Sequence, residues 1–383
     1  MCALLAFSVY GLRRSHYETF LSLHISLSAI VILTMYYHVE IFTSGEWYIF
    51  IYPCLVVWLF DRFLRTLRIL AFNLRFWGTK ATATYDAHSN LVRMEVPFKN
   101  SWIKPKAGTY YYIYVLDDIL YAHQNHPFTL AYVSSDTTTT LHSNTTSISN
   151  PRALLRPRAR RSSSIESTES DTLLFAPLSS TGFSSSLVFL IRPYDGFTSR
   201  LAKCASRSQS PTSLRVLVEG PYGHTLPLYT FPNILFIVGG TGIAVLLSHI
   251  TTILSQNSNV TELRIVWAVR EYAFLTSLIQ EFGGLLDDER IIFEAYITQD
   301  VDDKDEGDED GERDKALRRV KIEAGRPDVV SSVEQAAQDA GQDRLAVVAC
   351  GPGRMADEAR RTSVKMLGRG YHGVEYFEES FKW

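Results

Sequence analysis

The chain has 383 residues, which is room for two or three domains. Its formal net charge is −3 and 46% of its residues are hydrophobic, so its composition gives no reason to expect nucleic acid as a partner. The cysteines are scattered, and their spacing indicates neither a metal site nor a disulfide framework. They are Cys2, Cys54, Cys204 and Cys350.

Two apolar stretches near the N-terminus predict membrane helices. Residues 19–39 contain no Asp, Glu, Lys or Arg, and a stretch of this length can cross a bilayer. Residues 47–60 are also uncharged, but they span a membrane only if the charged residues that follow lie at the interface. The first ten residues do not predict a signal peptide, because Arg13 and Arg14 follow the apolar run instead of preceding it.

The basic residues around these stretches predict an orientation. Arginines precede the first stretch and follow the second, so both clusters lie on one side of the bilayer, and the positive-inside rule makes that side cytoplasmic. The chain is therefore expected to be a multi-pass membrane protein with cytoplasmic C-terminal domains. We expect the membrane to be the plasma membrane. The arginines are Arg13, Arg14, Arg62, Arg65, Arg68 and Arg75.

Two histidines lie within the first apolar stretch. His24 and His38 are 14 residues apart. In an α-helix they would project from one face, about 21 Å apart along the axis. Two imidazoles at two depths suit two stacked haem irons. Alternatively, His24 bonds a backbone carbonyl and His38 reaches the outer interface.

Short alternating segments after residue 79 predict a small antiparallel β-barrel. Strands are expected in residues 81–98, 106–116 and 187–192, a strand followed by a glycine turn in 214–223, and a turn into a helix at 194–201. Residues 134–172 interrupt this region, and their low complexity predicts a disordered insert.

The last part of the chain alternates strands with helices, which predicts a parallel, doubly wound α/β sheet. An acidic segment at 300–315 is expected to be a solvated loop and not a metal site. The expected strands are 235–238, 263–269, 291–297 and 345–349, and the expected helices lie near 245–255, 274–281 and 330–340.

Two glycine turns follow strands of this α/β region. Gly239, Gly240 and Gly242 stand between an apolar run and a helix, where backbone N–H groups and a helix N-terminus can hold a phosphate. The alternative is an ordinary strand-to-helix turn. Cys350 begins the second turn, where its sulfur could touch a nicotinamide ring or simply be a small buried side chain.

Together the motifs resemble the ferric reductase and NADPH oxidase superfamily, and most closely the fungal ferric-chelate reductases. The resemblance covers nearly the whole chain outside its two low-complexity loops. The motifs in order are RRSHYETFLSLH (13–24) with His38, LFDRFLRTLRI (59–69), HPFT (126–129), FLIRPYDGFTSRL (189–201), VEGPYG (218–223), VGGTGI (238–243), CGPG (350–353) and FEESFKW (377–383).

This resemblance implies three domains. Residues 1–78 would be the C-terminal part of a haem-binding transmembrane domain, 79–225 an FAD-binding β-barrel, and 226–383 an NADPH-binding α/β domain resembling ferredoxin reductases. Family members have about six core membrane helices, with the partner histidines on an earlier one. We therefore expect the sequence to be N-terminally truncated, with the haem b ligation incomplete.

The resemblance also implies site residues. The HPFT segment would lie along the flavin, the turn before residue 198 would lie by the FAD pyrophosphate, and Arg270 would pair with the 2′-phosphate of NADPH. Cys350 would face the nicotinamide and Trp383 would stack over the isoalloxazine. The residues expected at FAD are His126, Pro127, Phe128, Thr129, Arg192, Gly196 and Thr198. Those expected at the nicotinamide nucleotide are Gly220, Gly239, Gly240, Thr241, Gly242, Arg270, Gly351 and Pro352.

The implied activity is a membrane ferric-chelate reductase that moves electrons from cytosolic NADPH through FAD and haem to Fe(III) or Cu(II) chelates or siderophores outside the cytoplasm. Two alternatives stay open. One is an NADPH oxidase that produces superoxide, and the other is a membrane-tethered module without transmembrane electron transfer.

Overall fold

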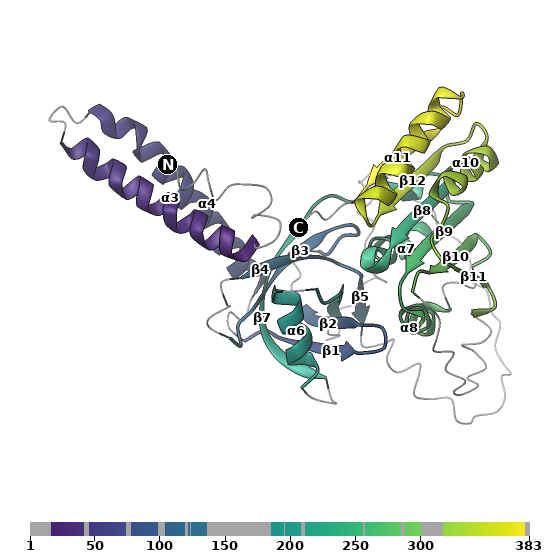
Figure 1. Cartoon of the computed structure of the whole chain (residues 1–383), viewed down its shortest axis with the longest axis horizontal. Helices are drawn as coiled ribbons and strands as arrows, with labels where there is room; N and C mark the ends of the chain where they lie inside the picture. Colours follow the sequence, from purple (N-terminus) through teal and green to yellow (C-terminus); the bar gives the residue numbers. More distant parts are fainter. Residues whose placement is uncertain are drawn as a thin grey trace, which may run out of the picture.

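The computed structural model places two helices at the N-terminal end, then an antiparallel sheet, then a parallel sheet with helices on both faces (Figure 1). The predicted acidic loop, most of the predicted insert and Trp383 lie outside the described residues. The structure describes residues 17–41, 46–73, 78–98, 104–118, 122, 124–135, 185–194, 196–207, 211–255, 257–284, 288–299 and 317–379.

The two N-terminal helices are α3 (Tyr17–Glu40) and α4 (Tyr52–Phe72), with a 3₁₀ turn, η1 (Glu46–Phe50), before α4. The helix α3 and the first half of α4 project away from the sheets (Figure 1), and both helices are long and apolar enough to cross a membrane. Most of their large apolar side chains are exposed, which suits a lipid environment. The prediction of two membrane helices is therefore supported by length, composition and exposure.

The antiparallel sheet has seven strands in the order β4-β3-β7-β1-β2-β6-β5. Inward residues of these strands and the helix α6 (Gly196–Ala205) share one apolar core, as expected for strands with one buried face. The edge strands β4 and β5 do not pair with each other, so within the described residues the predicted barrel is an open half-barrel. The strands are β1 (Lys80–Asp86), β2 (Leu91–Phe98), β3 (Tyr110–Val115), β4 (Asn125–Thr129), β5 (Tyr132–Ser135), β6 (Ser185–Ile191) and β7 (Thr212–Tyr222).

The second sheet has six strands, all parallel, in the order β11-β10-β9-β8-β12-β13. The doubly wound prediction is confirmed, and the four predicted strands are present, β10 with the predicted bounds and the other three with slightly longer ones. Two strands, β11 and β13, were not predicted. The strands are β8 (Asn233–Gly239), β9 (Glu262–Val269), β10 (Ile291–Ile297), β11 (Val320–Ala324), β12 (Leu345–Cys350) and β13 (Val374–Glu378).

Helices cover both faces of this sheet and create two apolar cores. One core packs the sheet against α7 and α8, and the other packs it against α10 and α11. Three of these helices match the predicted ones, whereas α11 was not predicted. The helices are α7 (Ile243–Ile253), α8 (Tyr272–Phe282), α10 (Val329–Ala340) and α11 (Gly353–Gly368), with 3₁₀ turns η2 (Leu228–Thr230) and η3 (Gly240–Gly242).

Candidate functional site

A pocket of about 780 Å³ lies at the carboxyl ends of β8 and β12. These strands are neighbours in the sheet, but the chain continues from β8 to β9 on one side and from β12 to β13 on the other. This is the switch point at which open α/β sheets bind ligands. The lining includes the predicted residues Arg192, Gly239, Gly240, Thr241, Gly242, Arg270, Cys350, Gly351 and Pro352.

The first glycine turn forms η3 and leads directly into α7. Gly240 has a φ of 53°, a left-handed conformation that favours glycine, and no atom lies within 4 Å of the position that a Cβ would occupy. Trp267 on β9 donates a hydrogen bond from Nε1 to the carbonyl oxygen of Gly240, at 2.9 Å. The hydrogen bond from Trp267 therefore fixes the turn on one side, while the side toward which a Cβ of Gly240 would project is open to a ligand.

The other glycines of the two turns allow close packing between the turns. A Cβ on Gly242 would lie 2.4 Å from the carbonyl oxygen of Cys350, and one on Gly239 would lie 2.8 Å from Cδ of Pro352. A Cβ on Gly351 would lie 3.0 Å from the backbone nitrogen of Gly239. The absence of side chains at these glycines therefore lets the two turns pack against each other, and both turns line the same pocket.

Cys350 is buried at the end of β12 and lines the pocket. Burial, with a contribution from Glu379, raises the pKa of its thiol to about 12. The sulfur is therefore a neutral thiol at physiological pH and not an activated nucleophile. Burial also raises the pKa of Glu379, while His224 opposes that shift. Glu379 lines the same pocket and was not among the predicted site residues.

Three arginines of the parallel domain line the pocket: Arg270, Arg326 and Arg354. Arg354 is ion-paired with Glu358 at 3.3 Å, whereas Arg270 and Arg326 make no ion pair with any described residue. Unpaired guanidinium groups at a pocket suit phosphate, which they can bind through two parallel hydrogen bonds. Arg326 and Arg354 were not predicted, because β11 and α11, which precede and contain them, were not recognised.

The HPFT segment forms most of the edge strand β4. His126 and Phe128 lie on one face of that strand, and their rings are 4.8 and 6.1 Å from the ring of Phe197 on α6. The structure thus brings this segment to the first turn of α6. That turn begins at Gly196, with a φ of 53°. Thr198 Oγ1 accepts a hydrogen bond from the backbone N–H of Tyr194, at 3.0 Å.

Arg192 joins the two sheets. It follows β6, its side chain is only 9% exposed, and it forms an ion pair with Glu271 at the start of α8. Glu271 Oε2 is buried without a hydrogen-bond partner among the described residues. Arg192 therefore connects the antiparallel domain with the pocket, which it also lines, and its contact with the FAD pyrophosphate stays a prediction.

A second contact between the sheets lies at the other end of α8. Arg93 on β2 pairs with Glu281 on α8 at 2.9 Å, and the hydroxyl of Tyr132 on β5 also donates to Glu281. The ring of Tyr132 packs edge-on against Phe282. These residues were not predicted, since a contact between domains leaves no periodic pattern in the sequence.

Other predicted site residues lie elsewhere. Gly220 is on β7, where a Cβ would lie 2.5 Å from the ring of Tyr111, and it does not line the described pocket. His24 and His38 lie on α3, and the ring of His24 stacks on Phe20. No group of three or more potential metal ligands occurs among the described residues. The predicted stacking of Trp383 falls outside the described part of the chain.

Family models match both sheet domains. The model described as "Ferric reductase NAD binding domain" matches residues 231–364, and the model described as "FAD-binding domain" matches residues 76–168. The two matches correspond to the parallel domain and to the first part of the antiparallel domain. They agree with the order of domains expected from the sequence.

Curated relatives match nearly the whole chain. The "Probable ferric reductase transmembrane component" of Candida albicans is 27% identical over 97% of this chain and 50% of its own length. The "Ferric/cupric reductase transmembrane component 2" of Saccharomyces cerevisiae is 25% identical over 98% of this chain and 48% of its own length. A solved ferredoxin NADP⁺ reductase from Neisseria gonorrhoeae has a TM-score of 0.47 and 12% identity, over 79% of this chain and 98% of that chain. The chain spans about half the length of the curated relatives that it matches.

Proposed function

From the premise that this chain belongs to the ferric reductase family, we propose that it is a membrane ferric-chelate reductase, which uses NADPH to reduce Fe(III) or Cu(II) chelates across the bilayer. The family models and relatives support an NAD(P)H-dependent flavin oxidoreductase in a membrane. The observation that carries the proposal is the pocket at β8 and β12, since its lining comes from both sheet domains.

The residues of this pocket fit a nicotinamide nucleotide. The open side of Gly240 leaves room for a diphosphate, which a side chain would block. Arg270 and Arg326 offer two guanidinium groups for the 2′-phosphate that distinguishes NADPH from NADH. Cys350 would face the nicotinamide with a neutral, apolar surface.

The antiparallel domain fits FAD. The N-terminus of α6 starts at a left-handed glycine, as a turn that approaches a diphosphate requires, and β4 would lie along the flavin. When bound, NADPH and FAD supply the hydride transfer and the change from two-electron to one-electron chemistry. The pocket at β8 and β12 would hold the nicotinamide nucleotide, and β4 with the start of α6 would hold FAD.

We also propose that His24 and His38 would each help to hold a haem, which would carry single electrons through the membrane segment. Both lie on α3 and are 14 residues apart, a spacing that suits two haems at different depths. The helix α4 contains no histidine, so residues outside these two helices would have to complete each haem site.

The 383-residue chain in lipid nanodiscs, supplied with FAD and haem b, tests the proposal. We expect flavin absorbance, NADPH-dependent reduction of a soluble dye, and Fe(II) formation from a ferric chelate. Superoxide in place of Fe(II) would identify an oxidase. A protein that binds no flavin and reduces no dye would be a membrane-tethered module without turnover.

A further inference from the structure

The C-terminal half of α4 is docked on the antiparallel domain. Asp61, Arg65, Arg68 and Phe72 are spaced to lie on one face of the helix. Arg65 and Arg68 lie over the rings of Tyr112 and Tyr222, and Phe72 enters the domain core. This half of the helix is therefore a stalk between the membrane segment and the sheet.

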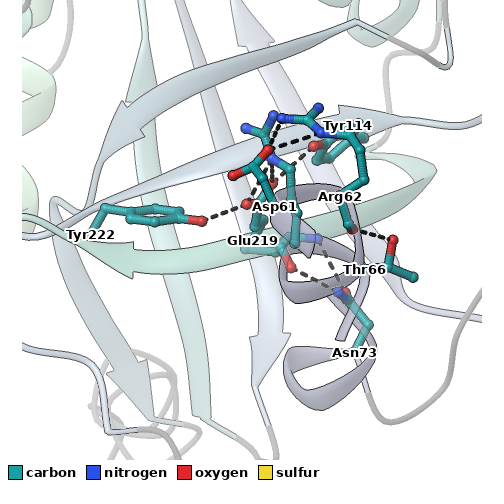
Figure 2. A network of polar contacts seen from close by, with 9 residues as sticks. Asp61, Arg62, Thr66, Asn73, Tyr114, Glu219 and Tyr222 are labelled. Carbon is teal, nitrogen blue, oxygen red and sulfur yellow. Dashed lines mark hydrogen bonds and ion pairs between the residues drawn. The ribbon is translucent and has the colours of Figure 1, made fainter. Parts of the chain in front are cut away.

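The contact centres on Glu219 of β7, whose side chain is completely buried. The guanidinium Nε of Arg65 donates to both carboxylate oxygens, at 3.0 and 3.1 Å. Figure 2 shows Glu219 between Tyr114 and Tyr222, whose hydroxyl groups also donate to it. A carboxylate this deeply buried needs such donors, because an unpaired buried charge is strongly destabilising.

The last turn of α4 continues the same contact. The side-chain amide of Asn73 donates to the carbonyl oxygen of Val218 at 2.7 Å and accepts from its N–H at 3.1 Å, as a neighbouring strand would (Figure 2). The ring of Phe72 lies 5.6 Å from that of Tyr111. The C-terminal end of α4 thus contacts two consecutive residues of β7, and the helix end and the strand form one rigid unit.

Strand pairing connects this unit to the expected flavin strand. Glu219 on β7 is opposite Tyr112 on β3, and Tyr112 is opposite Pro127 on β4. Directly opposed residues share a face of a sheet, so the three form a row across three strands. The row spans about 10 Å, at about 4.8 Å per strand. A shift of Glu219 relative to the membrane is therefore transmitted to the HPFT segment.

We propose that Arg65 and Glu219 are positioning residues, a clamp that sets the place of the flavin strand relative to the membrane helix. The proposal rests on the proposed reductase function, because the transfer of electrons from the flavin into the membrane needs a fixed distance between the flavin and the membrane helix. The clamp acts through β7 and β3 and touches no cofactor. The neighbouring Arg62 pairs with Asp61 on the helix itself, so it is no part of the clamp.

The test measures the distance between α4 and the antiparallel domain in full-length protein in nanodiscs. Cys2, Cys54 and Cys204 are replaced by serine, and spin labels are placed at Val56→Cys on α4 and Lys203→Cys on α6, both exposed positions. Pulsed electron paramagnetic resonance then gives the distance distribution. Glu219→Gln keeps the side-chain shape but removes the charge, and Arg62→Gln is the matched control.

We expect a narrow distribution in the parent protein and in Arg62→Gln, and a broadened or shifted one in Glu219→Gln. Fe(II) formation should fall at least tenfold in Glu219→Gln, while NADPH-to-dye turnover stays within threefold. If Glu219→Gln does not fold, Arg65→Gln takes its place, and Arg65→Lys should restore part of the narrow distribution. A distribution in the clamp variants equal to that of Arg62→Gln overturns the clamp. Absence of Fe(II) formation in the parent protein overturns the reductase function instead and leaves the distance result decisive for the clamp.

Discussion

Alanine substitutions made separately at Gly240 and Gly242, two glycines of one turn, should distinguish a role in nucleotide binding from a role in packing. Gly240 has a φ of 53°, and its Cβ position is free of atoms within 4 Å. An alanine there costs about 1 kcal/mol in backbone strain and places a methyl group where the diphosphate approaches. Loss of one charge-assisted hydrogen bond costs about 1.5–3 kcal/mol. The Kd for NADP⁺ should therefore rise about 10- to 150-fold in Gly240→Ala.

Gly242→Ala should act on stability as well. The Cβ of an alanine at this position would lie 2.4 Å from the carbonyl oxygen of Cys350 and 3.0 Å from its sulfur. The backbone of the first glycine turn therefore has to move away from the backbone at Cys350. Overpacking of this kind costs about 1–3 kcal/mol. We expect a lower unfolding temperature than in Gly240→Ala, together with weaker nucleotide binding, because the two turns separate.

The assay uses full-length protein in nanodiscs, with calorimetric titration of NADP⁺ and thermal unfolding followed by near-ultraviolet circular dichroism. An affinity of Gly240→Ala within twofold of the parent protein would refute the diphosphate position. Equal unfolding temperatures for the two variants would refute the packing argument for Gly242.

Three further predictions concern charged or buried groups. Arg270→Glu should raise the KM for NADPH at least tenfold more than the KM for NADH, and equal increases would exclude Arg270 from contact with the 2′-phosphate. Glu271→Gln should strengthen FAD binding severalfold, measured by flavin fluorescence, because it releases Arg192 from an ion pair; weaker binding would show that Glu271 helps to hold FAD. Burial lowers the pKa of His249 from 6.5 to about 4, so the unfolded chain binds the proton more readily and stability should fall by about 3 kcal/mol as the pH drops from 6.5 to 4. This fall should be smaller in His249→Gln in denaturant titrations at several pH values, and an equal fall would assign the acid sensitivity to other groups.

The sequence predicted the central strands of the parallel sheet well, because those strands are apolar runs bounded by turns. β8 and β12 are almost entirely buried, so their hydrophobicity is continuous. By contrast, β11 and β13 lie at the edges of the sheet, have only five residues each, and bury only the first of them. Such short edge strands resemble polar loops in sequence.

The helix α11 was missed for a different reason. Its buried residues are mostly small or weakly apolar, such as Ala356, Ala359 and Ser363, and its many charged residues make the segment polar overall, so its buried face was not recognised as an apolar stripe. The missing helix and strand then concealed Arg354 and Arg326. The glycine turns were predicted because clustered glycines by themselves indicate a tight backbone turn. An arginine that lines a pocket can be recognised only when the strand or helix that positions it has been identified.

The helix α8 is held at both ends by arginines of the other domain. Arg192 holds Glu271 at its start and is only 9% exposed, whereas Arg93 holds Glu281 near its end and is 38% exposed. Added salt weakens the exposed pair before the buried one. The two domains would then turn about the Glu271 end of α8, and ionic strength would decide whether the Glu281 end stays attached.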